Sequence, residues 1–157
     1  MDIQIKDNKI FAPLKDKWLV MKPEEEVRQR YICRLVDSYG YDLKQMDQEL
    51  KVTNSQRGQG AARADIVIWK SAKDKADSKS AFIVVECKAE SITIRKEDYY
   101  QGYNYAAWAG ADFFAVEGDL GHGVDHQFAT LGDIGKAARA SGIALRMGNR
   151  RGHTGPQ

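Results

Sequence analysis

The sequence predicts an α/β fold in which helices flank a mixed central β-sheet. Two short apolar segments, residues 63–69 and 82–88, have the length and β-branched composition of buried strands. The insert between them, residues 70–80, is polar, as in a surface hairpin loop, so we expect these strands to be antiparallel neighbours. A helical segment, residues 95–109, then leads to another apolar strand at 112–116, and such a crossover favours parallel pairing.

Length and composition fit one globular domain over residues 1–157, since the chain has 157 residues and is 43% apolar. No segment approaches the roughly 18 uninterrupted apolar residues of a membrane span. The N-terminus has no signal-peptide pattern, so we expect a cytoplasmic protein without a membrane partner. Cys33 and Cys87 are too few for a disulfide framework, and their spacing matches no zinc motif. The net charge of +2 does not by itself indicate a nucleic-acid-binding protein.

Residues 1–21 predict a short strand or arm, and a helix follows it. Pro23 in the first turn and the three acids at positions 24–26, beside the positive end of the helix dipole, indicate its start. Complementation of the dipole is on its own the simpler explanation of these acids. Gly40 is expected to end the helix. The apolar residues that repeat at a helical interval are Val27, Tyr31, Leu35 and Tyr39. Residues 48–53 then predict a strand followed by a glycine-containing turn.

The helix expected at 95–109 ends at Gly110 and carries an unusual stripe. Gln101, Tyr105 and Trp108 are spaced i, i+4 and i+7, which places them on one helix face. Aromatic stripes with this spacing usually belong to a core. A glutamine in such a stripe is less usual, because a buried amide needs hydrogen-bond partners.

The chain beyond residue 118 is rich in glycine and charge. His122 and His126 are spaced i, i+4, but without a third ligand in view we expect no metal site there. Residues 132–136 resemble half of a phosphate-binding loop, and the rest of that pattern is missing. Residues 143–147 predict a last strand or helix end, and 148–157 a flexible basic tail or a truncated linker.

Charged residues on the two central strands are the best candidates for a functional site. Glu86 and Lys88 leave the same face of their strand, roughly 7 Å apart, and burial of either charge without a partner is unfavourable. The hairpin brings Asp65 close to Glu86, where two carboxylates repel each other unless a cation lies between them. Oxygen ligands without histidine or thiolate select Mg²⁺ or Mn²⁺ over zinc. The alternative is a structural ion pair of these three residues at the end of the sheet.

Basic side chains also flank the two strands. They are Arg57, Arg63, Lys70, Lys73, Lys75 and Lys79. A solvated loop explains most of these lysines as well as a nucleic-acid partner does.

The candidate residues resemble a nuclease superfamily when they are taken together. Asp65 and residues 86–88 resemble the signature written PD-(D/E)xK, and residues 101–105 are similar to the Gln-x-x-x-Tyr motif of its RecB-like branch. Ala64 stands where the motif has proline, at a position that touches no ligand. Each motif alone occurs by chance, whereas all of them in this order form a fairly specific pattern.

The first predicted helix extends this resemblance. Residues 22–29 and 39–41 resemble the opening helix of the N-terminal nuclease domain of type I restriction enzyme R (motor) subunits. The resemblance covers about residues 22–117, the expected domain core. Because the chain has no Walker motif, ATP would be used by motor domains absent from it. The chain is then either a domain of such a subunit or a small stand-alone relative.

The resemblance implies a restriction-endonuclease-like core and Mg²⁺-dependent hydrolysis of phosphodiester bonds in DNA, with Mn²⁺ as a substitute metal. It implies that Asp65, Glu86 and the backbone carbonyl of Cys87 hold the metal. Glu24 aligns best with the acid of the family's first helix and would reach the metal through water. The neighbouring acids at 25–26 remain open, since a slip of one residue turns a helix by about 100°.

The resemblance also implies roles for Lys88, Gln101 and Tyr105. Lys88 would orient or deprotonate the attacking water and stabilise developing negative charge, and positioning is favoured because a basic lysine needs desolvation or nearby positive charge. Gln101 and Tyr105 would contact a DNA phosphate or brace Lys88. Arg63, one of the basic residues beside the strands, is a further candidate for binding DNA.

The implied partners are double-stranded DNA and the specificity and methylation subunits of a restriction complex. Because the resemblance implies that cleavage is gated by that complex, we expect the isolated chain to cut poorly. Two alternatives remain open. One is a stand-alone PD-(D/E)xK repair nuclease or junction resolvase, and the other is a nuclease-like module that binds DNA or protein without cutting.

Overall fold

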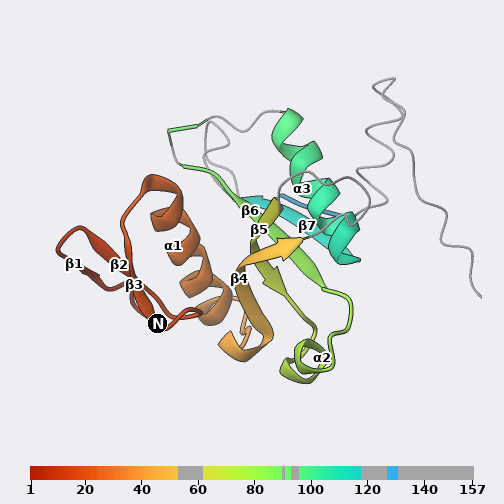
Figure 1. The fold of residues 1–157 in the computed structure, drawn as a ribbon, viewed down its shortest axis with the longest axis horizontal. Helices are drawn as coiled ribbons and strands as arrows, with labels where there is room; N and C mark the ends of the chain where they lie inside the picture. The colour runs from red at the N-terminus through yellow and green to blue at the C-terminus, as the bar shows by residue number, and fades with distance from the viewer. Residues whose placement is uncertain (53–61, 90, 93–95, 118–126, 131–157) are drawn as a thin grey trace, which may run out of the picture.

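The computed structural model describes residues 1–52, 62–89, 91–92, 96–117 and 127–130. Within them, a central sheet has five strands in chain order (Figure 1). They are β4 (Met46–Val52), β5 (Ala62–Ile68), β6 (Ile83–Cys87), β7 (Phe113–Glu117) and β8 (Gln127–Thr130). The β5–β6 pair is antiparallel and the β6–β7 pair is parallel, so both predicted pairings are confirmed. The fold is therefore α/β with a mixed sheet, as predicted.

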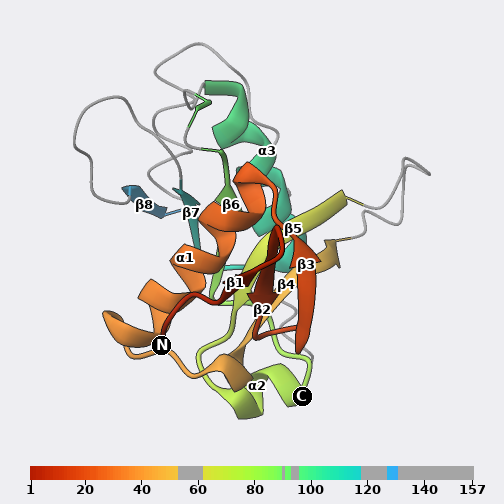
Figure 2. The same cartoon turned by 90° about the vertical axis from the view of Figure 1, so that its left-hand side faces the viewer.

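Two helices, α1 (Pro23–Asp37) and α3 (Lys96–Ala109), cover opposite faces of this sheet (Figures 1 and 2). Alternation along the strands divides the core between the two faces, because successive side chains point to opposite sides. Val85 packs with α1 residues such as Tyr31 and Leu35. Its neighbour Val84 packs instead with Tyr105 of α3.

Helix α1 begins and ends close to the predicted positions. Pro23 occupies its first turn, and Gly40 has the left-handed φ of 73° that favours glycine after a helix. Tyr39 was predicted to continue the apolar stripe, and this was wrong, since its exposed fraction is 45%. The helix ends at Asp37, so Tyr39 no longer follows the helical repeat.

The N-terminal arm forms a separate antiparallel sheet of β1 (Ile5–Lys6), β2 (Lys9–Ala12) and β3 (Lys17–Val20). Asp7 and Asn8 in the first hairpin turn both have positive φ, as the two central residues of a type I′ turn require. Ile10 is fully buried on β2, which packs against α1. The sequence predicted a strand or arm here but not its three strands.

The connection from β5 to β6 was predicted as a loop and contains a short helix, α2 (Ala72–Ala76). Its first turn is capped by Ser71, whose hydroxyl accepts a hydrogen bond of 3.0 Å from the backbone N–H of Asp74. A 3₁₀ helix, η1 (Leu43–Gln45), precedes β4. Strand β8 was not predicted at all.

A glycine sets the distance between α3 and the sheet. A Cβ atom added to Gly102 would lie only 2.0 Å from the ring of Phe114 on β7. The helix backbone therefore rests directly on the Phe114 ring, and this contact positions the α3 residues on either side of Gly102.

Several predictions concern residues outside the described part of the chain: the end of the 48–53 strand, the glycine-containing turn after it, and the segments at 122–126, 132–136, 143–147 and 148–157. Within the described residues, no helix has both the length and the apolar character that a bilayer crossing requires.

Candidate functional site

The hairpin of β5 and β6 brings two of the predicted site residues to neighbouring positions. The strand register pairs Ile66 with Val85, so that the next positions along the two strands are Asp65 and Glu86. Asp65 Oδ2 accepts a hydrogen bond of 2.8 Å from the backbone N–H of Cys87. The Asp65 carboxylate is thereby held against the end of β6.

Glu86 is a buried acid, with an exposed fraction of 4%. Burial, and secondly the charge of Asp65, raise the pKa of Glu86 to about 8. The charges of Lys88 and Arg28 act in the opposite direction, and the charge of Glu24 raises this pKa further. The residues that act on Glu86 therefore come from α1, β5 and the end of β6.

The charge of Glu24, the first of the three acids at the start of α1, acts on Glu86. Glu24 is exposed, whereas Glu25 is buried and binds other residues of its own helix. Glu25 Oε2 accepts from Arg28 Nη1 at 2.6 Å, and Glu25 Oε1 accepts from Gln29 Nε2 at 2.7 Å. Glu26 forms an exposed ion pair with Arg30 at 2.6 Å.

Arg28 is part of this site, and the sequence reasoning missed it. Its guanidinium is buried, and its Nη2 donates to Asp65 Oδ1 at 2.5 Å. Burial acts to lower the pKa of Arg28, but the charges of Asp65 and Glu25 outweigh it, so the pKa is raised. A basic residue one helical turn after a row of acids was the only local signal, and such pairs usually lie on a solvated face.

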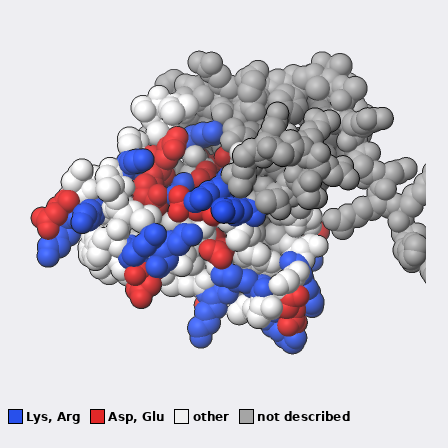
Figure 3. Space-filling model, in the orientation of Figure 1, with Lys and Arg blue, Asp and Glu red and all other residues white. Residues whose placement is uncertain are grey.

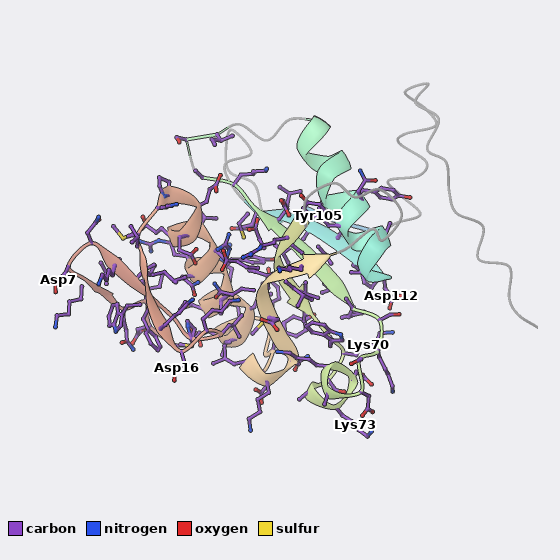
Figure 4. The ribbon with its side chains drawn as sticks, viewed as in Figure 1. Asp7, Asp16, Lys70, Lys73, Tyr105 and Asp112 are labelled. Carbon is purple, nitrogen blue, oxygen red and sulfur yellow. The ribbon has the colours of Figure 1, made fainter. Side chains whose placement is uncertain are left out.

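Lys88 follows directly after β6, and its backbone N–H donates to the carbonyl of Glu117 on β7 at 2.8 Å. Tyr105 lies on α3 and is 9% exposed, packed in the core on that side of the sheet (Figure 4). Gln101 belongs to the same helix one turn earlier, and its side chain is outside the described part of the structure. Arg63 is exposed on β5, opposite Lys51 on β4.

The basic residues of the β5–β6 connection lie at the other end of the sheet from Glu86. Lys73 belongs to α2 and Lys70 precedes this helix, and both lie away from Tyr105 (Figure 4). These lysines have acidic partners: Lys70–Asp112 at 3.0 Å, Lys73–Asp77 at 2.6 Å, Lys75–Asp47 at 3.5 Å and Lys79–Asp74 at 2.8 Å. Acidic and basic side chains are also intermixed over the face seen in Figure 3. The ordinary explanation of a solvated, ion-paired segment is therefore favoured for these lysines.

The donor chemistry of the site fits a hard divalent cation. Asp65 and Glu86 offer carboxylate oxygens, and a buried acid beside a second acid is stabilised in its charged form by a cation. The Cys87 side chain lies in the core, and this burial raises the pKa of its thiol well above the usual value. Among the described residues, no group of three His, Cys, Asp or Glu side chains has the arrangement of a metal site.

Comparison with protein-family models identified the family of this chain. The family model described as Type I restriction enzyme R protein N terminus (HSDR_N) matches residues 23–130. No curated protein and no solved structure matched the chain. The matched segment begins at the first residue of α1 and ends with β8, so it contains the whole candidate site. Because this match covers more than half of the sequence, the chain belongs to the family of type I restriction enzyme R protein N-terminal domains.

Proposed function

We propose that this domain is a Mg²⁺-dependent DNA endonuclease that hydrolyses phosphodiester bonds, and that Mn²⁺ can replace Mg²⁺. The observation that carries the proposal is the juxtaposition of Asp65 with the buried Glu86, with Lys88 two residues further on. Burial, and secondly the charge of Asp65, raise the pKa of Glu86 to about 8, so that a cation beside it would favour its ionised form at neutral pH. Family membership supports a nuclease role for such a pocket.

Asp65, Glu86 and the backbone carbonyl of Cys87 would hold the metal, and Glu24 would reach it through a water molecule. When bound, the metal supplies a water of lowered pKa and stabilises negative charge on the phosphoryl oxygens. The hydrogen bond from Cys87 N–H fixes the orientation of the Asp65 carboxylate.

Lys88 would hold the attacking water in line with the phosphorus atom and donate hydrogen bonds to the developing charge. This role needs only a positioned ammonium group, whereas acting as a base would need a strongly lowered pKa. Gln101 and Tyr105 would border the site from α3. Arg63, two residues before Asp65 on β5, would bind a phosphate of the DNA.

The proposed substrate is double-stranded DNA, reached in the cytoplasm. Specificity and methylation subunits would select the DNA, and ATP would be used by the motor domains of the complete R protein. The family description supports these partners, because it names the N terminus of a restriction enzyme R protein.

Calorimetric titration with Mn²⁺ tests the metal site without depending on cleavage. Asp65→Ala and Glu86→Ala are each expected to weaken binding at least tenfold, since each removes one charged ligand. Asp112→Ala is the matched control, because Asp112 is an exposed aspartate at the opposite end of the sheet. Identical Mn²⁺ binding by the wild type, Asp65→Ala and Glu86→Ala proteins would show that the assigned site is wrong.

A further inference from the structure

A buried guanidinium lies among three carboxylates at the candidate site. Arg28 on α1 is 7% exposed. Its Nη1 binds Glu25 Oε2 at 2.6 Å, its Nη2 binds Asp65 Oδ1 at 2.5 Å, and Glu49 Oε1 on β4 is 3.9 Å from Nη1. One side chain therefore contacts acids from α1, β4 and β5.

Both oxygens of the Asp65 carboxylate already accept hydrogen bonds. Oδ2 is bound by the backbone N–H of Cys87, and Oδ1 is bound by Arg28. A divalent metal that ligates Oδ1 does so at about 2.1 Å, which would place it within roughly 5 Å of the guanidinium. Two cations at that separation at a buried site repel each other strongly. Simultaneous binding of the metal and the Arg28 guanidinium to Asp65 is therefore unfavourable.

The Arg28 guanidinium has carboxylate partners other than Asp65, so it can release Asp65 and stay paired. Its other terminal nitrogen already binds Glu25, which Gln29 also holds in position. Glu49 is partly exposed and lies close enough for a small movement to bring it into hydrogen-bond distance. Release of Asp65 would therefore leave the guanidinium paired with two carboxylates, which avoids the large cost of an isolated buried charge.

We propose that Arg28 is an internal counter-ion that holds Asp65 in the metal-free protein, and that it keeps Glu25 but exchanges Asp65 for Glu49 when a divalent cation binds. The proposal rests on the proposed metal-dependent function and assigns Arg28 as a positioning residue of that site. It makes the affinity for metal the result of a competition between two cations for Asp65 Oδ1. It also keeps the acidic cluster assembled before metal and DNA arrive.

The first test compares Mn²⁺ affinity of Arg28→Gln with that of the wild type by calorimetry on the full chain. Glutamine can still donate to Glu25 but carries no charge, so Asp65 is left available. We expect roughly tenfold tighter binding, the size of the effect of losing one competing charge-assisted hydrogen bond. Arg30→Gln is the control, because Arg30 lies on the same helix and pairs with Glu26 on the exposed side. It should bind Mn²⁺ like the wild type.

The second test separates exchange from a general effect of charge. Glu49→Gln removes the carboxylate that would pair with Arg28 after metal binding. In the wild-type background this change should therefore weaken Mn²⁺ binding. In the Arg28→Gln background the same change should have a clearly smaller effect, because no guanidinium has to be accommodated. A purely electrostatic influence of Glu49 on the metal would instead weaken binding equally in both backgrounds.

The outcomes distinguish this proposal from the proposed function. If Arg28→Gln binds Mn²⁺ as the wild type does, or more weakly, the exchange is overturned and the metal site stands. Equal effects of Glu49→Gln in both backgrounds also overturn the exchange. If Arg28→Gln does not fold, the single variant Glu49→Gln decides, because Mn²⁺ binding equal to that of the wild type overturns the exchange. If the wild type, Arg28→Gln and Glu49→Gln proteins all fail to bind Mn²⁺, the metal-dependent function fails and the exchange fails with it.

Discussion

The backbone N–H of Cys87 donates a 2.8 Å hydrogen bond to the side chain of Asp65. At this end of the hairpin, the backbone pairing of β5 and β6 stops at Ile66 and Val85. The hydrogen bond between Cys87 and Asp65 links the two strands beyond that last pair. Asp65 therefore has a structural role as well as its proposed role as a metal ligand. Its other oxygen binds Arg28 and connects the same point to α1.

Removal of this carboxylate should destabilise the metal-free protein. Asp65→Ala leaves Arg28 with one fewer partner in a buried position and is expected to lower the free energy of unfolding by about 3 kcal/mol. Asp65→Asn keeps an acceptor for the Cys87 N–H and should cost about 1 kcal/mol. Urea denaturation with EDTA present measures both.

Asp112→Ala serves as the control for this comparison, since the Lys70–Asp112 pair is exposed and should contribute within about 0.5 kcal/mol. Equal stabilities of the wild type and Asp65→Ala would mean that Asp65 does not connect the two strands and the helix.

The raised pKa of Glu86 predicts a dependence of stability on pH. Folded Glu86 keeps its proton up to about pH 8, whereas the unfolded chain releases it near 4.5, the ordinary pKa of a glutamate. The folded state thus binds more protons than the unfolded state between these values. The free energy of unfolding should therefore fall as pH rises through this window and level off above it.

Denaturation in EDTA at several pH values from about 5 to 9 measures this slope. Glu86→Gln should remove the contribution of this residue, because its amide does not titrate. Mn²⁺ affinity should increase over the same window, since the cation displaces the proton. The assignment to Glu86 fails if the slope is unchanged in Glu86→Gln.

The contact between Gly102 and Phe114 predicts a steric effect on α3. Gly102→Ala places a Cβ atom 2.0 Å from the ring, and it should cost about 2 kcal/mol and displace the helix. Gly40→Ala is the matched comparison, because nothing lies within 4 Å of the added atom and only its φ of 73° is unfavourable. Its cost should be about 1 kcal/mol.

Phe114→Leu distinguishes the two mechanisms. In the Gly102→Ala background the smaller side chain should recover part of the lost stability, measured by thermal denaturation, because the overlap is relieved. It should recover none in the Gly40→Ala background. Equal behaviour in both backgrounds would exclude overlap as the cause.

The sequence predicted the parts of this fold that depend on local patterns. Strands β5 and β6 are short apolar segments that contain one acid each, Asp65 and Glu86. Helix α1 begins with a proline and three acids and continues with an apolar repeat. Each element was therefore recognisable from neighbouring residues. Arg28 was not recognisable in this way, because its partner Asp65 lies 37 residues away in sequence. Only the packing of α1 against the sheet brings them together.

The other differences have similar causes. Strand β8 pairs with β7 through backbone hydrogen bonds and follows a segment rich in glycine, where no periodic pattern indicated a strand. Helix α2 is only five residues long, and its capping serine was not distinguished from the polar residues around it. Tyr39 matched the helical interval by spacing alone, beyond the point where the helix ends.

The two cysteines provide a probe of opening at the β5–β6 site. The Cys87 thiol is 3% exposed, and burial raises its pKa, so a thiol reagent should react with it only when the end of β6 opens. Cys33 is partly exposed on α1 and should react in the native state, although burial raises its pKa too and slows the reaction.

The Cys33→Ser variant isolates the signal of Cys87. Its labelling should be slow, should become faster in Asp65→Ala because the hydrogen bond to the Cys87 N–H is lost, and should become slower with Mn²⁺ if the metal binds beside it. Labelling of Cys87 at the native rate of Cys33 would mean that β6 is not held closed by Asp65, because a thiol in that core cannot react without exposure.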